Sequence, residues 1–148
     1  YSIGVTTLIV SLIVLFFWIP LKQKPGIGTI LNTILISVVI DLSITYLPYP
    51  DEFIFQLLQV CIGVFIIGIG SGFYLIANLG PGSRDGLMTG IQRKTNFSFT
   101  IVRTVIELSA VALGWHLGGI VGIGTVIYAL GIGPLVSFGL FFVGKFFR

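Results

Sequence analysis

The longest stretch of the chain without a Lys, Arg, Asp or Glu extends from Leu108 to Gly144. Three other charge-free runs precede it, at Ile3–Leu21, Gly26–Ile40 and Phe53–Leu79. An α-helix needs about 20 apolar residues to cross the hydrocarbon core of a bilayer, so the longest run must hold more than one crossing. The runs do not alternate polar and apolar residues as the strands of a membrane barrel do. We therefore expect an all-α polytopic membrane protein.

The amino-acid composition excludes an ordinary soluble domain. Hydrophobic residues make up 55% of the chain and charged residues 9%, whereas soluble globular domains carry about 25% charged residues. The net charge is +3, but no basic patch is interleaved with aromatic residues, so nucleic acid is not an expected partner. The expected partner is the lipid bilayer, whose anionic headgroups attract the basic residues.

Enzyme chemistry finds little support in the sequence. The chain has one His and one Cys, so neither a metal cluster nor a Cys–His catalytic pair can be assembled, and no metal or cofactor is expected. Ser71 lies within "GIGSG" without a plausible general base, and the spacing of Gly68 and Gly72 is typical of a helix-packing face. We expect that the protein is not an enzyme.

Turn-forming residues divide the apolar runs into helices. The stretches "KQKPG", "LPYPDE" and "NLGPGSRDG" mark the joints, and the longest run is expected to break at "HLGG". A single transmembrane domain, 1–148, is therefore expected to hold about five spans, at 3–20, 28–46, 53–78, 99–116 and 121–143.

The basic residues set the expected orientation in the membrane. If the loop with Lys22 and Lys24 is cytoplasmic, alternation of the spans places seven of the eight basic residues on that side. Asp51, Glu52 and His116 then lie on the opposite side. Because Lys and Arg are enriched in cytoplasmic loops, the C-terminus is expected to be cytoplasmic.

The tetrapeptide "GIGT" occurs twice, and the two copies are 96 positions apart. The same shift aligns 1–12 with 97–108 without a gap, which favours a duplicated pair of helices over chance similarity of glycine-rich sequence. The glycines permit close backbone approach, and the threonine can cap the second helix or form a hydrogen bond across helices. The residues of the two copies are Gly26, Gly28 and Thr29, and Gly122, Gly124 and Thr125.

The two copies are expected to have opposite orientations, because three spans separate their starting points. Repeat A is taken as 1–46 and repeat B as 53–143 with a linker at 79–96, and segments 1–40 and 97–136 are expected to match as an inverted-topology repeat. Inverted repeats are the recurrent architecture of secondary transporters. A span and a linker precede the second copy, so a matching pair is expected upstream of Tyr1, where the sequence starts without Met.

Three ionisable residues fall inside expected spans and are candidates for coupling or substrate binding: Asp41, Arg103 and Glu107. A charge at the centre of a membrane helix costs about 2.5–3.5 kcal/mol, so such residues are functional candidates by default. Arg103 and Glu107 stand four residues apart and can pair on one helix face. Mutual neutralisation or snorkelling of Arg103 is the structural interpretation, and binding of a proton or cationic substrate by Glu107 is the functional one.

The linker is a second candidate site. Its backbone is interrupted at the "GPG" that contains Gly80 and Gly82, and Asp85 is expected to cap a short helix over about 86–94. A helix N-terminus with Arg84 beside it can receive an anion. The alternative is a surface connector in which Arg84 and Asp85 pair with each other.

Four segments resemble the YczE-like (YczE/YyaS/YitT) group of bacterial integral membrane proteins: "PLKQKPGIGTILN", "LGPGSRDGLMTGIQRKTNFS", "VRTVIELSAVALGW" and "GGIVGIGTVIYALGIGPLV". The resemblance covers nearly the whole chain. Members typically start with a further helix and a Gly-Pro-x-Asp stretch, which matches the upstream segment expected above and is missing from this sequence. The resemblance implies a multi-pass protein of the bacterial cytoplasmic membrane and brings no established biochemical activity.

Transport or export of a small molecule, with proton coupling as one form of it, is the leading functional hypothesis. The alternative is a non-catalytic accessory subunit that scaffolds another membrane system. A transporter is expected to bring Asp41, Arg103 and Glu107 together in a polar, water-accessible cavity, whereas a scaffold is expected to direct its small-residue faces and its charges toward a partner. Both a homo-oligomer and a complex with another membrane protein fit the sequence.

Overall fold

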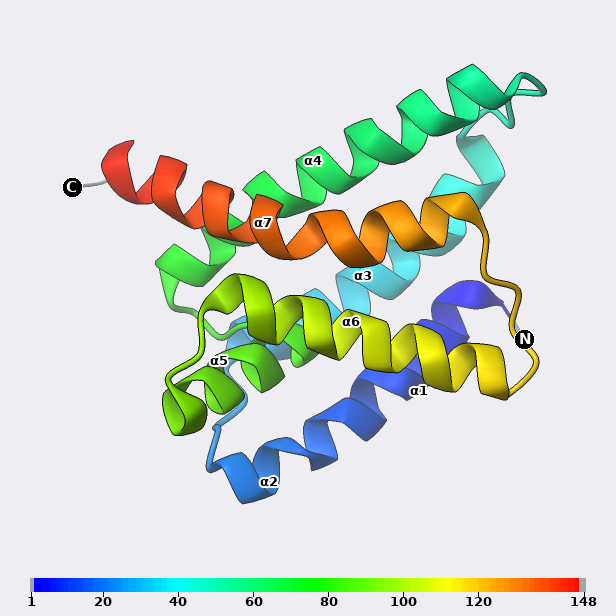
Figure 1. Cartoon of the computed structure of the whole chain (residues 1–148). Helices are drawn as coiled ribbons and strands as arrows, with labels where there is room; N and C mark the ends of the chain where they lie inside the picture. The colour runs from blue at the N-terminus through cyan, green and yellow to red at the C-terminus, as the bar shows by residue number, and fades with distance from the viewer. Residues whose placement is uncertain (1, 147–148) are drawn as a thin grey trace. The chain divides into compact units, whose positions relative to one another are not determined.

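The computed structural model describes residues 2–146, and the secondary structure of this part is entirely helical (Figure 1). The helices are α1 (Ile3–Phe16), α2 (Trp18–Leu21), α3 (Ile27–Tyr46), α4 (Phe53–Ala77), α5 (Ser83–Thr95), α6 (Phe99–His116) and α7 (Ile123–Phe146). The all-α class predicted from the apolar runs is confirmed. The boundaries of α3, α4 and α6 lie within one residue of the predicted spans.

Three described helices, α3, α4 and α7, are long and apolar enough to cross a membrane. α1 is a shorter apolar helix, and α6 combines 18 residues with the two charges of Arg103 and Glu107. The helices α3, α4 and α7 therefore support the polytopic membrane class. The count of five spans stays a prediction.

The first predicted span, 3–20, is interrupted at Phe17, so that α1 is followed by the short helix α2. Proline has no backbone N–H, so Pro20 cannot donate the hydrogen bond that the carbonyl of Phe16 would accept in a continuous helix. The chain instead tightens into a shorter turn, in which the N–H of Phe17 donates to the carbonyl of Val14 at 3.0 Å.

The chain packs as two compact units. Unit 1 consists of residues 1–49 and 78–96, and therefore joins α1, α2 and α3 to α5 of the linker. Unit 2 consists of residues 50–77 and 97–148, and therefore joins α4 to α6 and α7. The linker, which precedes the second helix pair in sequence, thus packs with the first pair.

One face of α3 carries buried hydroxyl groups within unit 1. Thr29, Thr33 and Ser37 are buried, and they follow one another at intervals of four residues. The hydroxyls of Thr33 and Ser37 donate to the backbone carbonyls one turn earlier, each at 2.9 Å. These short side chains satisfy their own polar groups and let another helix approach closely.

Unit 2 is held by a close crossing of α4 and α7. A side chain on Gly68 would overlap Leu135, and one on Gly72 would overlap the backbone of Gly139. The prediction that Gly68 and Gly72 form a helix-packing face is therefore confirmed, and the face is used inside the chain. The absence of side chains allows backbone approach and extensive van der Waals contact.

The helix pairs α1–α3 and α6–α7 begin in the same way at positions 96 residues apart. The second helices begin at Ile27 and Ile123, directly after the first glycine of each "GIGT". The first helices are capped by serine hydroxyls: Ser2 accepts from the N–H of Val5 at 3.2 Å, and Ser98 accepts from the N–H of Ile101 at 3.3 Å.

The turns between the two helices of each pair also correspond. Lys22 and Gly118, again 96 positions apart, both have positive φ, at 53° and 92°. The next residue then donates to a carbonyl five positions earlier: Gln23 to Trp18 at 3.2 Å, and Gly119 to Gly114 at 2.8 Å. This is the Schellman pattern, which satisfies the last carbonyls of a helix.

The α1–α3 crossing and the α6–α7 crossing involve equivalent positions. The glycine lies on the first helix of one pair and on the second helix of the other. In unit 1, a side chain on Gly4 of α1 would overlap Ser37 of α3. In unit 2, the equivalents are Thr100 of α6 and Gly133 of α7, and a side chain on Gly133 would overlap Thr100. The glycine has changed helices while the contact has stayed in place.

We predict that Gly72→Ala destabilises the protein by about 1–3 kcal/mol, because the new methyl group meets the backbone of Gly139 in a packed crossing. Gly70→Ala is the matched control on the same helix, since a side chain at Gly70 has nothing within 4 Å. That variant should be neutral or gain up to about 1 kcal/mol from helix propensity. Thermal unfolding of the purified variants in detergent measures the difference, and equal stability of the two would contradict the crossing.

Candidate functional site

α6 holds a buried ion pair at its centre. The guanidinium Nη2 of Arg103 lies 3.0 Å from Oε1 of Glu107, and the two side chains are only 5% and 3% exposed. The hydroxyl of Ser98 fixes the start of the helix, and one helical turn separates the two charges. The pairing predicted from the spacing is therefore present, and Arg103 is buried instead of extended toward the interface.

This pair is costly for the protein to keep. Transfer of two charges out of water costs several kcal/mol per ion, which the attraction between them repays only in part. A pair of apolar side chains would fill the same space without that cost. An Arg and a Glu at buried positions of an apolar helix are therefore candidates for a function beyond packing.

Asp41 lies in unit 1 and has a different environment. Its carboxylate accepts a hydrogen bond from the hydroxyl of Ser2 at 2.7 Å and one from the backbone N–H of Gly4 at 2.8 Å. It thereby satisfies an N–H group at the start of α1 and joins α3 to α1. The equivalent position in unit 2 is Ser137, whose hydroxyl lies 2.8 Å from that of Thr100.

Asp41 and the Arg103–Glu107 pair belong to different packed units. The structure therefore assigns a local role to each, namely capping of α1 by Asp41 and pairing within α6 for the other two. The expected convergence of all three in one cavity stays a prediction.

The linker packs against the first "GIGT" and forms hydrogen bonds with it. The N–H of Gly28 donates to the carbonyl of Leu79 at 2.9 Å, and the hydroxyl of Thr29 donates to the carbonyl of Pro81 at 2.7 Å. The same hydroxyl accepts from the N–H of Gly26 at 3.2 Å, so it caps α3 as well. The capping predicted for the threonine is confirmed in this copy, whereas its second hydrogen bond goes to the linker and not to another helix. A side chain on Gly26 or Gly28 would collide with the linker backbone.

The linker turns sharply before α5. Gly80 has φ of 119°, a conformation that L side chains rarely adopt, and a side chain there would also meet Thr29. A side chain on Gly82, at the cap of α5, would lie 2.9 Å from the amide oxygen of Asn32 and 3.2 Å from a carboxylate oxygen of Asp85. The predicted helix over 86–94 is present but longer, at Ser83–Thr95.

Arg84 and Asp85 stand in the first turn of α5. Asp85 is buried, and Arg84 is half-buried. A carboxylate in the first turn of a helix interacts favourably with the positive end of the helix dipole. The prediction that Asp85 caps this helix is wrong, because the N-cap is Gly82 and Asp85 is the third residue of α5. The anion site and the surface connector both stay predictions.

Sequence reasoning missed two features of unit 1. Trp18 is almost fully buried, and its indole N–H donates to the carbonyl of Ser83 at 2.9 Å while the ring covers Gly86. An aromatic residue in an apolar run gives no signal for such a contact. The buried hydroxyls of Thr33 and Ser37 could have been found, because Thr29, Thr33, Ser37 and Asp41 follow a strict interval of four.

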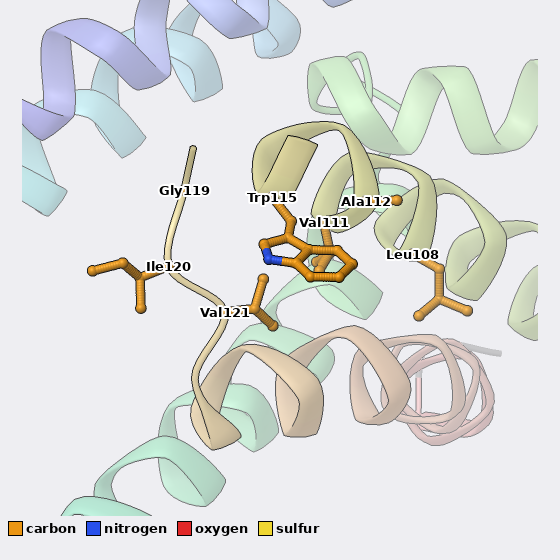
Figure 2. A pocket seen from close by; sticks show the side chains of 7 residues that line it. All are labelled: Leu108, Val111, Ala112, Trp115, Gly119, Ile120 and Val121. Carbon is orange, nitrogen blue, oxygen red and sulfur yellow. The ribbon is translucent and has the colours of Figure 1, made fainter. Parts of the chain in front are cut away.

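A pocket of about 710 Å³ lies at the end of α6, beside the loop that leads to α7. Its lining is apolar, and none of the candidate charges takes part: Leu108, Val111, Ala112, Trp115, Gly119, Ile120 and Val121. In Figure 2 the indole of Trp115 lies next to Val121, whereas the side chain of Ile120 points away from it.

The comparison with known proteins decides the lineage. The model of a family described as a family of unknown function (DUF6198) matches residues 1–140. The chain belongs to this family. A membrane protein of Bacillus subtilis, YczE, is 36% identical over 95% of the chain, so the predicted YczE-like lineage is confirmed.

A protein of Haemophilus influenzae is 37% identical over 98% of the chain. The matched region makes up 66% of the Haemophilus protein and 63% of YczE, so the chain spans just under two thirds of the length of these relatives. No solved structure matches the chain.

We predict that the contributions of Arg103 and Glu107 to the free energy of unfolding depend strongly on each other. Arg103→Met and Glu107→Leu should each cost about 3–5 kcal/mol, because each leaves a buried charge without its counterion, and the double variant should lose less than either. Thermal unfolding of the four proteins in detergent gives the double-mutant cycle. Losses that simply add in the double variant would contradict the coupling.

Proposed function

We propose that the chain is the membrane core of a small-molecule transporter or exporter of the bacterial cytoplasmic membrane. The observation that carries the proposal is the Arg103–Glu107 pair, buried at the centre of α6. Glu107 is the ninth of the 18 residues of α6, about 13 Å from its start, too deep for a short carboxylate to reach headgroup water. Intramembrane ionisable residues of this kind mark substrate and proton pathways.

The second support is the correspondence of the two helix pairs. Caps, turns and helix crossings recur at the same interval of 96 residues as the sequence match. With three crossings between the two starting points, the pairs have opposite orientations, which is the architecture of many secondary transporters. In this arrangement the chain has five spans, and its C-terminus and its basic loops lie in the cytoplasm.

Coupling to protons follows from the chemistry of the pair. The carboxylate of Glu107 is held by a guanidinium on its own helix, so a proton or a cationic substrate competes with Arg103 for the same oxygen atoms. The equivalent positions in the first pair are Thr7 and Ser11, so the charges exist in one half only. Such asymmetry suits a coupling site that acts in one direction.

An accessory subunit that scaffolds another membrane system is the second candidate. The exposed apolar end of α6 favours it, since Leu113, Trp115 and Leu117 are 65%, 71% and 86% exposed. Against it stands the use of the small residues: Gly68 and Gly72 pack on α7 within the chain and are not presented to a partner. We therefore rank transport first.

The orientation is testable with single cysteines in a Cys61→Ala background. Asp51→Cys should react with a membrane-impermeant maleimide added to intact cells, and Lys22→Cys should react only after the membrane is opened, because the basic loop is expected to be cytoplasmic. Labelling of Lys22→Cys in intact cells would reverse the orientation.

The coupling role is testable with Glu107→Gln in the full-length protein. Metabolite profiling of cells with and without the protein first identifies a transported compound, whose uptake or export is then measured across a range of pH. Glu107→Gln should insert and fold but lose the pH-dependent activity, and Arg103→Gln added to it should not restore activity. The matched control is Glu52→Gln, which removes an exposed carboxylate of a loop and should leave activity unchanged.

Normal activity of Glu107→Gln at every pH would end the coupling hypothesis. The scaffold would then rank first.

A further inference from the structure

The linker between the two helix pairs covers the first pair, although it leads into the second. Its backbone covers the first "GIGT" and accepts two hydrogen bonds there, from the N–H of Gly28 to the carbonyl of Leu79 and from the hydroxyl of Thr29 to the carbonyl of Pro81. Helix α5 continues along the end of α1 and along α2, where the ring of Trp18 lies over Gly86 and Leu21 lies next to Gly90. The end of the first helix and the start of the second are thus both covered in unit 1.

The equivalent surface of unit 2 is uncovered in the described part of the chain. A side chain on Gly122 would have nothing within 4 Å, and one on Gly124 would meet only the side chain of Val60. Neither glycine therefore meets a backbone segment such as the one that seals Gly26 and Gly28. Ile120 is 97% exposed, and the apolar pocket of Figure 2 opens at this point.

We propose that a segment upstream of Tyr1 in the longer protein docks here, with a linker on the second "GIGT" and a short helix along the end of α6. Two observations carry this assignment. The contacts within the helix pairs recur at an interval of 96 residues, so the counterpart of the 79–95 segment falls upstream of Tyr1. The relatives are longer than the matched region by about a third of their length, so they hold residues outside it. The proposal is independent of transport.

The size of the docked residues follows from the same correspondence. In unit 1 the large Trp18 packs on the glycine at position 86. The counterpart of Trp18 is Gly114, beside which a side chain would have nothing within 4 Å. The space beside Gly114 leaves room for a large side chain of the docked helix. The upstream residue equivalent to Gly86 should therefore be large.

The same correspondence predicts a second contact, between α3 and a span that would precede the docked linker. α4 precedes the linker and packs on α7 along Gly124, Leu135 and Gly139. The counterparts of the last two on α3 are Val39 and Ser43, and Val39 is 55% exposed. An upstream span that precedes the docking linker is expected to cover this face of α3.

Cysteine protection tests the docking. Ile120→Cys in the Cys61→Ala background is labelled with a soluble maleimide, once in the 148-residue chain and once in the protein extended upstream to its natural start. The extended form should react at least about tenfold more slowly, because the cysteine is reached only when the segment opens. Asp51→Cys, in a loop distant in sequence from the docking surface, is the control and should react equally in both forms.

Gly114→Trp separates docking from folding. A Cβ at this position has nothing within 4 Å in the 148-residue chain, so thermal unfolding of that form should change little. In the extended form it occupies the position of the docked helix, so the labelling of Ile120→Cys should return to the fast rate.

Three results would overturn the proposal. The first is equal labelling of the two forms, and the second is protection already in the 148-residue chain, which would assign the surface to lipid or to a second copy. The third is protection of the extended form that persists in Gly114→Trp, which would place the segment elsewhere.

Discussion

Helix pairs in lipid are held by close backbone approach, because the apolar side chains gain little by leaving one hydrocarbon environment for another. Within each of the two repeated helix pairs, a glycine makes this approach possible, Gly4 against Ser37 in the first and Gly133 against Thr100 in the second. The hydrogen bonds of Asp41 to Ser2 and Gly4 follow from the first crossing, and the contact of Ser137 with Thr100 follows from the second. Position 41 and position 137 are equivalent, so a carboxylate and a hydroxyl serve the same joint in the two halves.

The linker uses the same principle for a different purpose. Glycines 26, 28 and 80 bring two backbone segments into contact, and Thr29 then bonds to both of them. A loop at the end of a membrane helix would otherwise expose its polar groups at the interface. The linker thus belongs structurally to the pair that precedes it, while the sequence groups it with the pair that follows.

The ion pair of α6 stands apart from this architecture. The crossings need only small residues, and the first pair has Thr7 and Ser11 at the positions of Arg103 and Glu107. The duplicated framework can therefore be built without charges at these positions, and the ion pair distinguishes the second helix pair from the first. Since buried charges cost stability, the ion pair is most simply explained by a function that uses a carboxylate in the membrane.

The sequence by itself determined the class, the boundaries of α3, α4 and α6, the Gly68–Gly72 packing face and the pairing of Arg103 with Glu107, because hydropathy, turn residues and an interval of four act locally. It also revealed the interval of 96 residues. Only the tertiary structure decided that Trp18 covers Gly86, that Asp41 caps α1, and that the linker seals the first "GIGT" and leaves the second one open. Such contacts join residues far apart in the chain, and many apolar side chains of similar size could have made them. Their choice depends on the geometry of the crossings, which no local pattern encodes.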